Sequence, residues 1–356
     1  MKILFEHQHL YYLPQFEPII ILLKKIEVND LYGSLSVSVP KIEKNLFNDE
    51  MARLGLGVIE GNSESQRRRI LKEMSFDIIF VGNKTSLSYI KSKSSFSVMI
   101  YHGIGLKQSY YTDLSHKMDL ICVESSSRNK SLKRMGFNSV ETGFTKLDLL
   151  KNYDRINPRE LSRPRVLYAP TFFPSSIQKT IPYLRTLVDF KIQIKLHHFF
   201  WTDPRYMKIC SFLKEEIKGL KHISLIPFEE YNILKYFSSS DLLISDFSST
   251  LFEFLTVNRP IIQATYFTSR FKYQIFPQLL KKRMDKTRER LVDFTLKCDS
   301  PEEISNQIHV SLSDSNNFEG RRLAASKIFL GNINENASKK VIDAIKSHGI
   351  PIGQTE

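Results

Sequence analysis

Short apolar runs of four or five residues alternate with helical patterns along most of the chain. Residues 2–6, 77–81 and 261–264 are examples of such runs, and 15–25 and 204–218 are examples of the helical patterns. A strand, a helix and a second strand in succession form a parallel sheet that carries helices on both faces. We therefore predict an α/β protein with doubly wound, Rossmann-like sheets.

The alternation is interrupted once, over the polar residues 152–164, which include two prolines. We interpret this stretch as a linker between an N-terminal domain, 1–151, and a C-terminal domain, 165–356. The last helix, near 335–347, would then belong to the C-terminal domain. The alternative is that this helix packs back on the N-terminal domain. The other predicted strands are 35–39, 56–60, 97–101, 120–124, 166–169, 193–196, 223–226 and 242–245.

The chain is strongly basic, with a formal net charge of +13 over 356 residues. A basic excess favours an anionic partner such as nucleic acid, a phospholipid surface or a phosphate-bearing substrate. No nucleic-acid-binding motif supports the first of these partners. A Gly-x-Gly-x-x-Gly or Walker loop is absent, which argues against an NAD enzyme or a P-loop kinase. Cys122, Cys210 and Cys298 lack metal or redox spacing, so we expect a reducing cytosol. The apolar run 19–23 is far too short to span a membrane, so we expect a soluble or peripheral protein.

The stretch from Ser245 to Thr250 joins a predicted strand to a predicted helix, 250–257. Backbone N–H groups and the helix dipole at such a place bind anions, and the hydroxyls of Ser248 and Ser249 add donors. The simpler alternative is that one of these serines only caps the helix. Glu253 lies about one helical turn further on, where its carboxylate could accept hydrogen bonds from ribose hydroxyls.

Two histidines end predicted strands in different halves of the chain. His102 precedes Gly103, and a histidine beside glycines that admit a ligand is a candidate general base. His197 is the second, and one histidine would activate an acceptor while the other holds a pyrophosphate. The alternatives are that His102 is a loop residue without a role, and that His198 rather than His197 acts.

Weaker candidates follow other strands. Lys107 would neutralise phosphate or be a solvated lysine, and Thr171 would face the ligand or simply form a turn. Asp148 would bind a hydroxyl, orient a basic group or start a helix, and Arg259 would hold an acidic neighbour. In residues 270–288, aromatic and aliphatic residues alternate with cations, which suits an anionic membrane surface or, as an alternative, a solvated basic helix.

Taken in order, these motifs resemble the CDP-glycerol glycerophosphotransferase family, the teichoic-acid primases and polymerases. The resembling segments are 101–107, 143–148, 167–171, 195–197, 241–262 and 331–345. The resemblance implies a GT-B-like fold in which two Rossmann-like domains, acceptor-side and nucleotide-donor-side, face a central cleft. It also implies transfer of a polyol phosphate from a CDP-activated donor to a hydroxyl of a lipid-linked glycan or growing polymer, with release of CMP.

By this resemblance His102 and His197 match the two catalytic histidines of the family, and Ser248 and Ser249 match its serines near the donor pyrophosphate. Gly103, Thr171, Asp246 and Glu253 complete the predicted donor-binding set, with Lys107, Asp148 and Arg259 in support. The chain departs from the family at Ile104-Gly105, Phe172-Phe173 and His198, where Thr-Pro, Trp-Arg and proline are usual. The donor polyol is therefore open between glycerol, which we favour, ribitol and another group.

The resulting prediction is an enzyme of teichoic-acid-like or capsular polymer synthesis. Its partners would be a CDP-polyol, a lipid-linked glycan and an anionic membrane surface, without nucleic acid, on the inner face of the cytoplasmic membrane. No metal site and no tightly bound cofactor are expected, and a divalent cation remains open. The alternatives are a GT-B glycosyltransferase that uses a nucleotide sugar and, less favoured, a basic protein that only binds nucleic acid or membrane.

Overall fold

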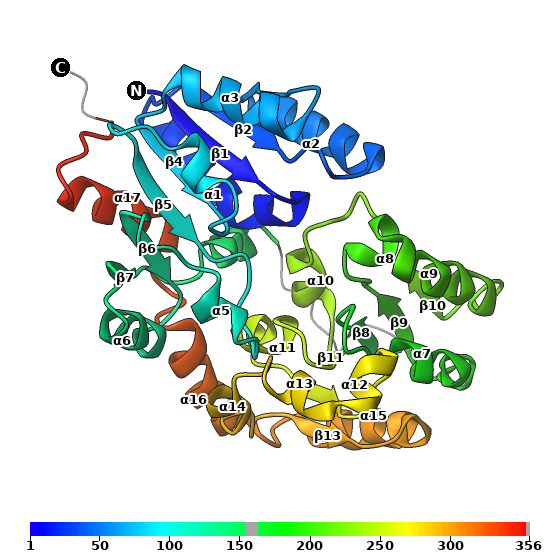
Figure 1. The fold of residues 1–356 in the computed structure, drawn as a ribbon. Helices are drawn as coiled ribbons and strands as arrows, with labels where there is room; N and C mark the ends of the chain where they lie inside the picture. Colours follow the sequence, from blue (N-terminus) through cyan, green and yellow to red (C-terminus); the bar gives the residue numbers. More distant parts are fainter. Residues whose placement is uncertain (154–162, 354–356) are drawn as a thin grey trace. The chain divides into compact units, whose positions relative to one another are not determined.

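The computed structural model describes residues 1–153 and 163–353 (Figure 1). Contacts between residues divide the chain into two compact units. Unit 1 is formed by the described parts of Met1–His102, Ser109–Leu149 and Ile328–Glu356, and unit 2 by those of Gly103–Gln108 and Leu150–Lys327. Most of the predicted linker, 152–164, lies outside the described residues. The domain limits 1–151 and 165–356 stay a prediction. The two units differ from these limits because residues 103–108 and 150–151 belong to unit 2, and residues 328–353 belong to unit 1.

Unit 1 contains a fully parallel sheet with the strand order β3-β2-β1-β4-β5-β6-β7. β1 lies inside the sheet between β2 and β4, and Ile3 pairs with Leu31 on one side and with Ile78 on the other. The direction of strand order reverses between β1 and β4, and ligands of such sheets bind beyond the carboxyl ends of the strands near that point. The strands are β1 (Ile3–His7), β2 (Leu31–Leu35), β3 (Gly57–Val58), β4 (Ile78–Val81), β5 (Phe96–Ile100), β6 (Leu120–Val123) and β7 (Ser139–Glu141).

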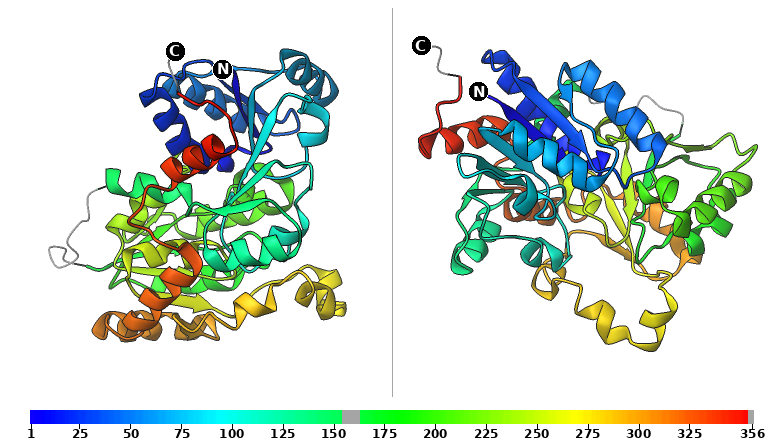
Figure 2. Two further views of the ribbon diagram at one scale, coloured as in Figure 1. Left: turned by 90° about the vertical axis from the view of Figure 1, so that its left-hand side faces the viewer. Right: turned by 45° about the horizontal axis from the view of Figure 1, so that its top comes forward.

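The helices of unit 1 cover both faces of its sheet. The side chain of Ser63 caps α3 by accepting from Gln66 N, and Gly55 ends α2 in the left-handed conformation. α17, red in Figure 2, packs against α1, which brings the C-terminal part of the chain onto its N-terminal part. The helices are α1 (Leu13–Lys25), α2 (Lys41–Leu54), α3 (Glu64–Met74), α4 (Leu87–Ile90), α5 (Ser109–Thr112), α6 (Ser126–Arg134) and α17 (Ala337–Ser347), with 3-10 turns η1 (Leu10–Tyr12) and η2 (Thr145–Asn152).

Unit 2 contains a second parallel sheet, with the order β10-β9-β8-β11-β12-β13. Its order reverses between β8 and β11, so the chain segments that follow these two strands adjoin the expected ligand-binding edge. Buried side chains such as Val166, Ile192 and Ile244 leave little polar surface on either face, as parallel strands require. The strands are β8 (Arg165–Ala169), β9 (Lys191–Ile194), β10 (Ile223–Leu225), β11 (Leu242–Ser245), β12 (Ile261–Ala264) and β13 (Leu296–Cys298).

The helices of unit 2 are shorter on average than those of unit 1, and several consist of one turn. α16 carries the chain from unit 2 back into unit 1. The helices are α7 (Ile177–Thr180), α8 (Phe199–Thr202), α9 (Pro204–Glu216), α10 (Leu234–Ser239), α11 (Thr250–Glu253), α12 (Phe271–Ile275), α13 (Pro277–Lys281), α14 (Lys286–Glu289), α15 (Ile304–Ser313) and α16 (Glu319–Leu330), with 3-10 turns η4 (Ile181–Thr186), η5 (Phe254–Val257) and η6 (Pro301–Glu303).

The predicted fold class of two parallel, doubly wound α/β sheets is confirmed. One predicted strand, 35–39, is wrong, because the strand is β2 and residues 36–39 form the loop after it. That loop is held by side chains, and Glu64 accepts a hydrogen bond from Val37 N at 3.1 Å. Among residues 1–153 and 163–353, no helix combines the length and the hydropathy needed to cross a bilayer.

Gly61→Ala is expected to destabilise unit 1. A Cβ at Gly61 would lie 2.6 Å from the backbone N of Arg67, so the start of α3 would have to shift, and the buried guanidinium of Arg67 pairs with Glu6 at 3.0 Å. We expect the free energy of unfolding in urea to fall by about 1–3 kcal/mol. Gly320→Ala is the control, because a Cβ there meets nothing within 4 Å. Equal stability of the two variants would contradict the close approach at Gly61.

Candidate active site

In unit 1, His102 follows β5 and its ring is held by the backbone of the neighbouring strand end. Its Nδ1 lies 3.2 Å from the carbonyl oxygen of Gly82, which follows β4. A carbonyl can only accept, so Nδ1 carries the proton of this hydrogen bond. In the neutral ring Nε2 is then the acceptor nitrogen, which is the state that a general base requires.

Aromatic rings fix the plane of His102. Tyr12 stacks on it with ring centroids 4.8 Å apart, and Tyr11 lies 5.6 Å away edge-on. Gly82 permits this stacking, because a Cβ there would lie 2.5 Å from the Tyr12 ring. Burial raises the pKa of the Tyr12 phenol well above its usual value, so the phenol stays neutral, and it accepts from Asn83 Nδ2 at 2.7 Å.

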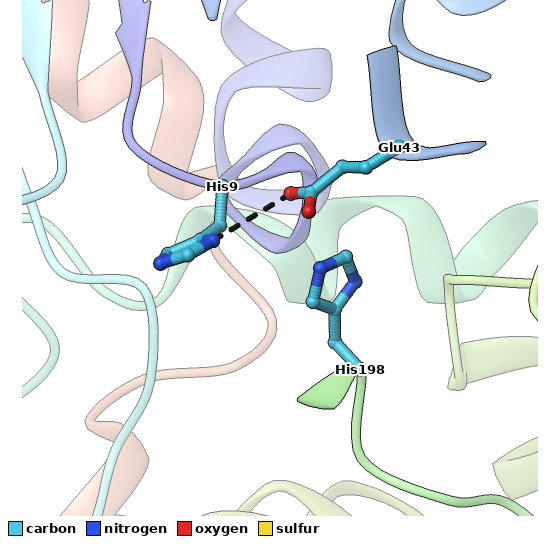
Figure 3. Close-up of side chains that lie close together, drawn as sticks. All are labelled: His9, Glu43 and His198. Carbon is cyan, nitrogen blue, oxygen red and sulfur yellow. Dashed lines mark ion pairs between the residues drawn. The ribbon is translucent and has the colours of Figure 1, made fainter. Parts of the chain in front are cut away.

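A further histidine, His9, extends this aromatic group and was missed by the sequence analysis. Its ring stacks on Tyr11 with centroids 5.1 Å apart, and its Nδ1 lies 3.7 Å from Oε1 of Glu43, as the dashed line in Figure 3 marks. The same carboxylate oxygen accepts from Leu10 N at 2.7 Å. The signal that could have identified His9 is its position two residues after β1, at the reversal of strand order.

In unit 2, His197 follows β9 and takes the opposite tautomer. Its Nδ1 accepts a hydrogen bond from Phe199 N at 3.2 Å, so this nitrogen carries no proton. In the neutral ring the proton therefore lies on Nε2, which is a donor. The Phe172 ring packs against His197 with centroids 4.5 Å apart, so an aromatic residue that departs from the family pattern orients this histidine.

Asp246 joins the loop after β11 to the loop after β8. Its Oδ1 accepts from Thr171 N at 2.7 Å, and its Oδ2 accepts from Ser176 N and Ser176 Oγ, both at 2.9 Å. The carboxyl is fully buried, and burial raises its pKa from 3.8 to about 6 although these hydrogen bonds oppose the shift. In this structure Asp246 therefore positions Thr171 and its neighbours.

The predicted anion-binding serines lie between the end of β11 and the start of α11. Ser248 and Ser249 are partly exposed, and Ser249 makes no side-chain cap although it is the N-cap residue. Ser248 Oγ accepts from Thr250 N at 3.3 Å. The predicted helix 250–257 is one α-helical turn followed by the 3-10 turn η5, and Glu253 is buried within it. The dipole of so short an element is weaker than the prediction assumed.

Lys107 belongs to the short segment Gly103–Gln108 of unit 2. Backbone hydrogen bonds hold this segment, from Asp285 N to Leu106 O at 2.6 Å and from Gln108 N to Arg283 O at 2.9 Å. The ammonium of Lys107 lies 5.0 Å from the centre of the Phe172 ring. Burial, with a smaller effect of the Arg283 charge, lowers the pKa of Lys107 from 10.5 to about 8. Phe172 thus contacts both Lys107 and His197.

Two other predicted site residues, Asp148 and Arg259, make hydrogen bonds that stabilise the fold. Asp148 accepts from Ala337 N at 3.0 Å, from Ser338 N at 2.7 Å and from Ser338 Oγ at 2.6 Å, so its carboxylate caps α17. The guanidinium of Arg259 donates to Ser238 O at 3.0 Å and to Ser240 O at 2.5 Å, which satisfies carbonyls at the end of α10. These partners support structural roles for both residues.

The chain matches a family model over residues 48–346, that of CDP-Glycerol:Poly(glycerophosphate) glycerophosphotransferase. The chain belongs to this family. The family predicted from the ordered motifs is thus confirmed. Among curated proteins it is similar to the teichoic acid glycerol-phosphate primase of Bacillus spizizenii, with 32% identity over 108 residues. That match covers 28% of this chain and 25% of the primase, so the chain spans only about a quarter of the relative's length.

Solved structures establish the fold over nearly the whole chain. A variant of the wall teichoic acid polymerase TagF soaked with CDPG superposes with a TM-score of 0.69 and 17% identity, covering 98% of this chain and 88% of the polymerase. A UDP-N-acetylglucosamine 2-epimerase from Listeria monocytogenes gives a TM-score of 0.61 and 14% identity, with 98% and 97% covered. At these identities the likeness concerns the fold, and it confirms the GT-B-like class.

Asp148→Ala is expected to loosen α17 without acting on the chemistry directly. The change removes three hydrogen bonds to the first turn of the helix, so the free energy of unfolding should fall by about 1–2 kcal/mol. Asp343→Ala, on the exposed face of the same helix, is the matched control and should change it by less than about 0.5 kcal/mol. Urea unfolding measures both, and an equal loss in the two variants would contradict the capping role.

Asp246 is expected to make stability depend on pH. Because its folded-state pKa, about 6, lies above the ordinary 3.8, the folded state binds the proton more tightly than the unfolded state does. The contribution of Asp246 to the free energy of unfolding should therefore be about 1 kcal/mol larger at about pH 5 than at about pH 7. This contribution should disappear as the pH rises through 6. Asp246→Asn should remove that component from urea unfolding curves measured across the range. An unchanged pH dependence in the variant would refute the assignment.

Proposed function

We propose that this chain transfers glycerol phosphate from CDP-glycerol to a hydroxyl of a lipid-linked glycan or growing polymer, in teichoic-acid-like synthesis, and releases CMP. Family membership over residues 48–346 supports the reaction class. The observation that carries the assignment of roles is the opposite tautomeric state of His102 and His197. One ring presents an acceptor nitrogen and the other a donor, as transfer of a charged group to a hydroxyl requires.

In the proposed step the acceptor oxygen attacks the phosphorus that bears glycerol. A new oxygen–phosphorus bond forms, the bond from this phosphorus to the bridging oxygen breaks, and CMP leaves with the bonding electrons. Nε2 of His102 takes the proton of the attacking hydroxyl, which raises the nucleophilicity of its oxygen. Nε2–H of His197 donates to the pyrophosphate, where negative charge accumulates as the bond breaks.

The donor is held, in this proposal, by groups around the carboxyl ends of β8 and β11. The hydroxyls of Ser248 and Ser249 donate to phosphate oxygens, and the ammonium of Lys107 supplies a positive charge. Gly103 and Thr171 contribute backbone close to the donor, and Glu253 remains a candidate for the ribose. Asp246 acts indirectly, because it positions Thr171, and through it Phe172, against which Lys107 and His197 pack.

The acceptor and the site of action follow from the same proposal. A lipid-linked glycan lies in a membrane, so the enzyme would work as a peripheral protein on the inner face of the cytoplasmic membrane, where anionic lipids attract a chain of net charge +13. Dependence on a divalent cation is open, and CMP release in the presence and absence of EDTA tests it.

His102→Gln and His197→Gln test the two roles. Glutamine retains a polar side chain but cannot take up the proton, so His102→Gln should lower kcat by about 10²- to 10⁴-fold. His197→Gln should lower kcat by about 10²- to 10³-fold through lost charge stabilisation. The measurement is acceptor-dependent CMP release from CDP-glycerol and CDP-ribitol, with His309→Gln, an exposed histidine, as the control.

Normal turnover in either variant would remove that histidine from the mechanism. Turnover of a UDP- or CMP-sugar, with every CDP-polyol inert, would replace the proposal by the glycosyltransferase alternative. Unfolding curves that match the wild type would establish that a loss of turnover reflects chemistry rather than a change of fold.

A further inference from the structure

His9 lies at the same edge of the unit 1 sheet as His102. It follows the end of β1 by two residues, and His102 follows the end of β5 by two. β1 and β5 flank β4 in the sheet, and the strand order reverses between β1 and β4. Because ligands of such sheets bind beyond the carboxyl ends of the strands, both histidines lie where a ligand of unit 1 is expected. His9 precedes residues 48–346, over which the family model matches, so family membership gives it no role.

The carboxylate of Glu43 orients the His9 ring. Glu43 belongs to the first turn of α2 and is fully buried. Its Oε1 accepts from Leu10 N at 2.7 Å and lies 3.7 Å from Nδ1 of His9. A buried carboxylate is unfavourable without donors around it, and it can only accept. The proton of a neutral His9 ring is therefore favoured on Nδ1, which leaves Nε2 as the acceptor nitrogen.

The two ring nitrogens of His9 have different surroundings. Nδ1 is buried, whereas the side chain as a whole is 30% exposed, so its exposed atoms lie elsewhere on the side chain. Figure 3 shows the second ring nitrogen, Nε2, directed away from Glu43. The ring therefore presents its acceptor nitrogen on the side opposite its carboxylate partner.

Tyr11 joins His9 and His102 into one aromatic group. Its ring stacks on His9 with centroids 5.1 Å apart and planes 11° apart, and its centroid lies 5.6 Å from that of His102. Tyr12 packs against Tyr11 with centroids 5.0 Å apart and stacks on His102. Burial raises the pKa of the Tyr11 phenol, so the ring between the histidines stays neutral. These contacts hold the two histidines at a set separation, within reach of one ligand.

We propose that His9 binds the acceptor and that Glu43 positions it. Nε2 of His9 accepts a hydrogen bond from a second hydroxyl of the acceptor, on the carbon next to the one whose hydroxyl His102 deprotonates. The pair thereby selects acceptors that end in a vicinal diol, as a glycerol phosphate unit or a sugar does. The inference rests on the proposed function and deepens it, because it names the chemical class of the acceptor.

Calorimetric titration with a soluble acceptor probe tests the proposal without donor. The probe is a disaccharide that carries one glycerol phosphate unit, and its deoxy analogue lacks the secondary hydroxyl of that unit. The wild type should bind the probe about tenfold more tightly than the analogue, because the analogue cannot make the hydrogen bond to Nε2 of His9. This comparison involves no substitution in the protein, so a change of fold cannot produce the difference.

Substitutions at His9 separate the roles of its two nitrogens. The amide nitrogen of asparagine matches the place of Nδ1, whereas the amide group of glutamine reaches the place of Nε2. His9→Asn should therefore weaken probe binding about tenfold and bind the probe and its analogue alike, while His9→Gln should keep most of the preference. His116→Asn is the control, because His116 also stacks on an aromatic ring of unit 1, that of Phe137, with centroids 4.3 Å apart.

Glu43→Gln tests the positioning role. The glutamine amide can donate to Nδ1 of His9, which moves the ring proton to Nε2 and removes the acceptor nitrogen. The preference for the probe over its analogue should then disappear although His9 is intact. Glu17→Gln is the control, because Glu17 is a buried carboxylate of unit 1 that pairs with Arg53 at 2.7 Å instead.

Turnover separates this proposal from the proposed function. With CDP-glycerol as donor, His9→Asn should raise the KM for the probe about tenfold and change kcat far less, because His102 is retained. The proposal is overturned if the wild type binds the probe no better than the analogue, or if His9→Asn binds both compounds as the His116→Asn control does. A wild type that prefers the probe but turns over no CDP-polyol would refute the assigned chemistry and still support the acceptor site.

Discussion

The buried carboxylate of Asp246 is the interaction on which the candidate site of unit 2 depends. It joins residues 75 positions apart in the chain, because it accepts from Thr171 N and Ser176 N across the reversal of strand order between β8 and β11. Burial of the charged group is unfavourable and raises its pKa. Two N–H donors and a hydroxyl replace the hydrogen bonds to water that the carboxylate loses on burial. With Thr171 in place, the next residue, Phe172, is placed against both His197 and Lys107.

The two histidines illustrate how backbone surroundings divide the chemical roles of one residue type. His102 faces a carbonyl, which forces a proton onto Nδ1, while His197 faces a backbone N–H, which removes the proton from that atom. Neither state needs a charged neighbour, and both rings are further oriented by aromatic contacts, with Tyr12 and with Phe172. A transfer reaction that needs both a base and a hydrogen-bond donor can therefore use histidine twice.

Local patterns predicted most of the fold and part of the candidate site. The strands 242–245 and 261–264 lie where the apolar runs placed them, because a parallel strand buried on both faces needs a continuous apolar sequence. The same argument failed for 35–39, where the apolar and polar alternation continues past the end of β2 into a loop that side chains hold. His9 also follows a strand, but it was missed because its contacts with Tyr11 and Glu43 become visible only in three dimensions.

By itself the sequence determined that two βα series form parallel sheets and which residues follow the strands, since hydrophobic periodicity and strand-end chemistry are short-range properties. Tertiary structure decided which of those residues remain available for a ligand. The carboxylate of Asp148 is occupied by the start of α17, about 190 residues away, and that of Asp246 by the loop after β8. Tertiary structure also decided the tautomer of His102, whose partner is the carbonyl of Gly82 on a neighbouring strand end, whereas the tautomer of His197 is set locally by Phe199 N. The partners of Asp148, Asp246 and His102 come from other parts of the chain, and no local pattern encodes such partners.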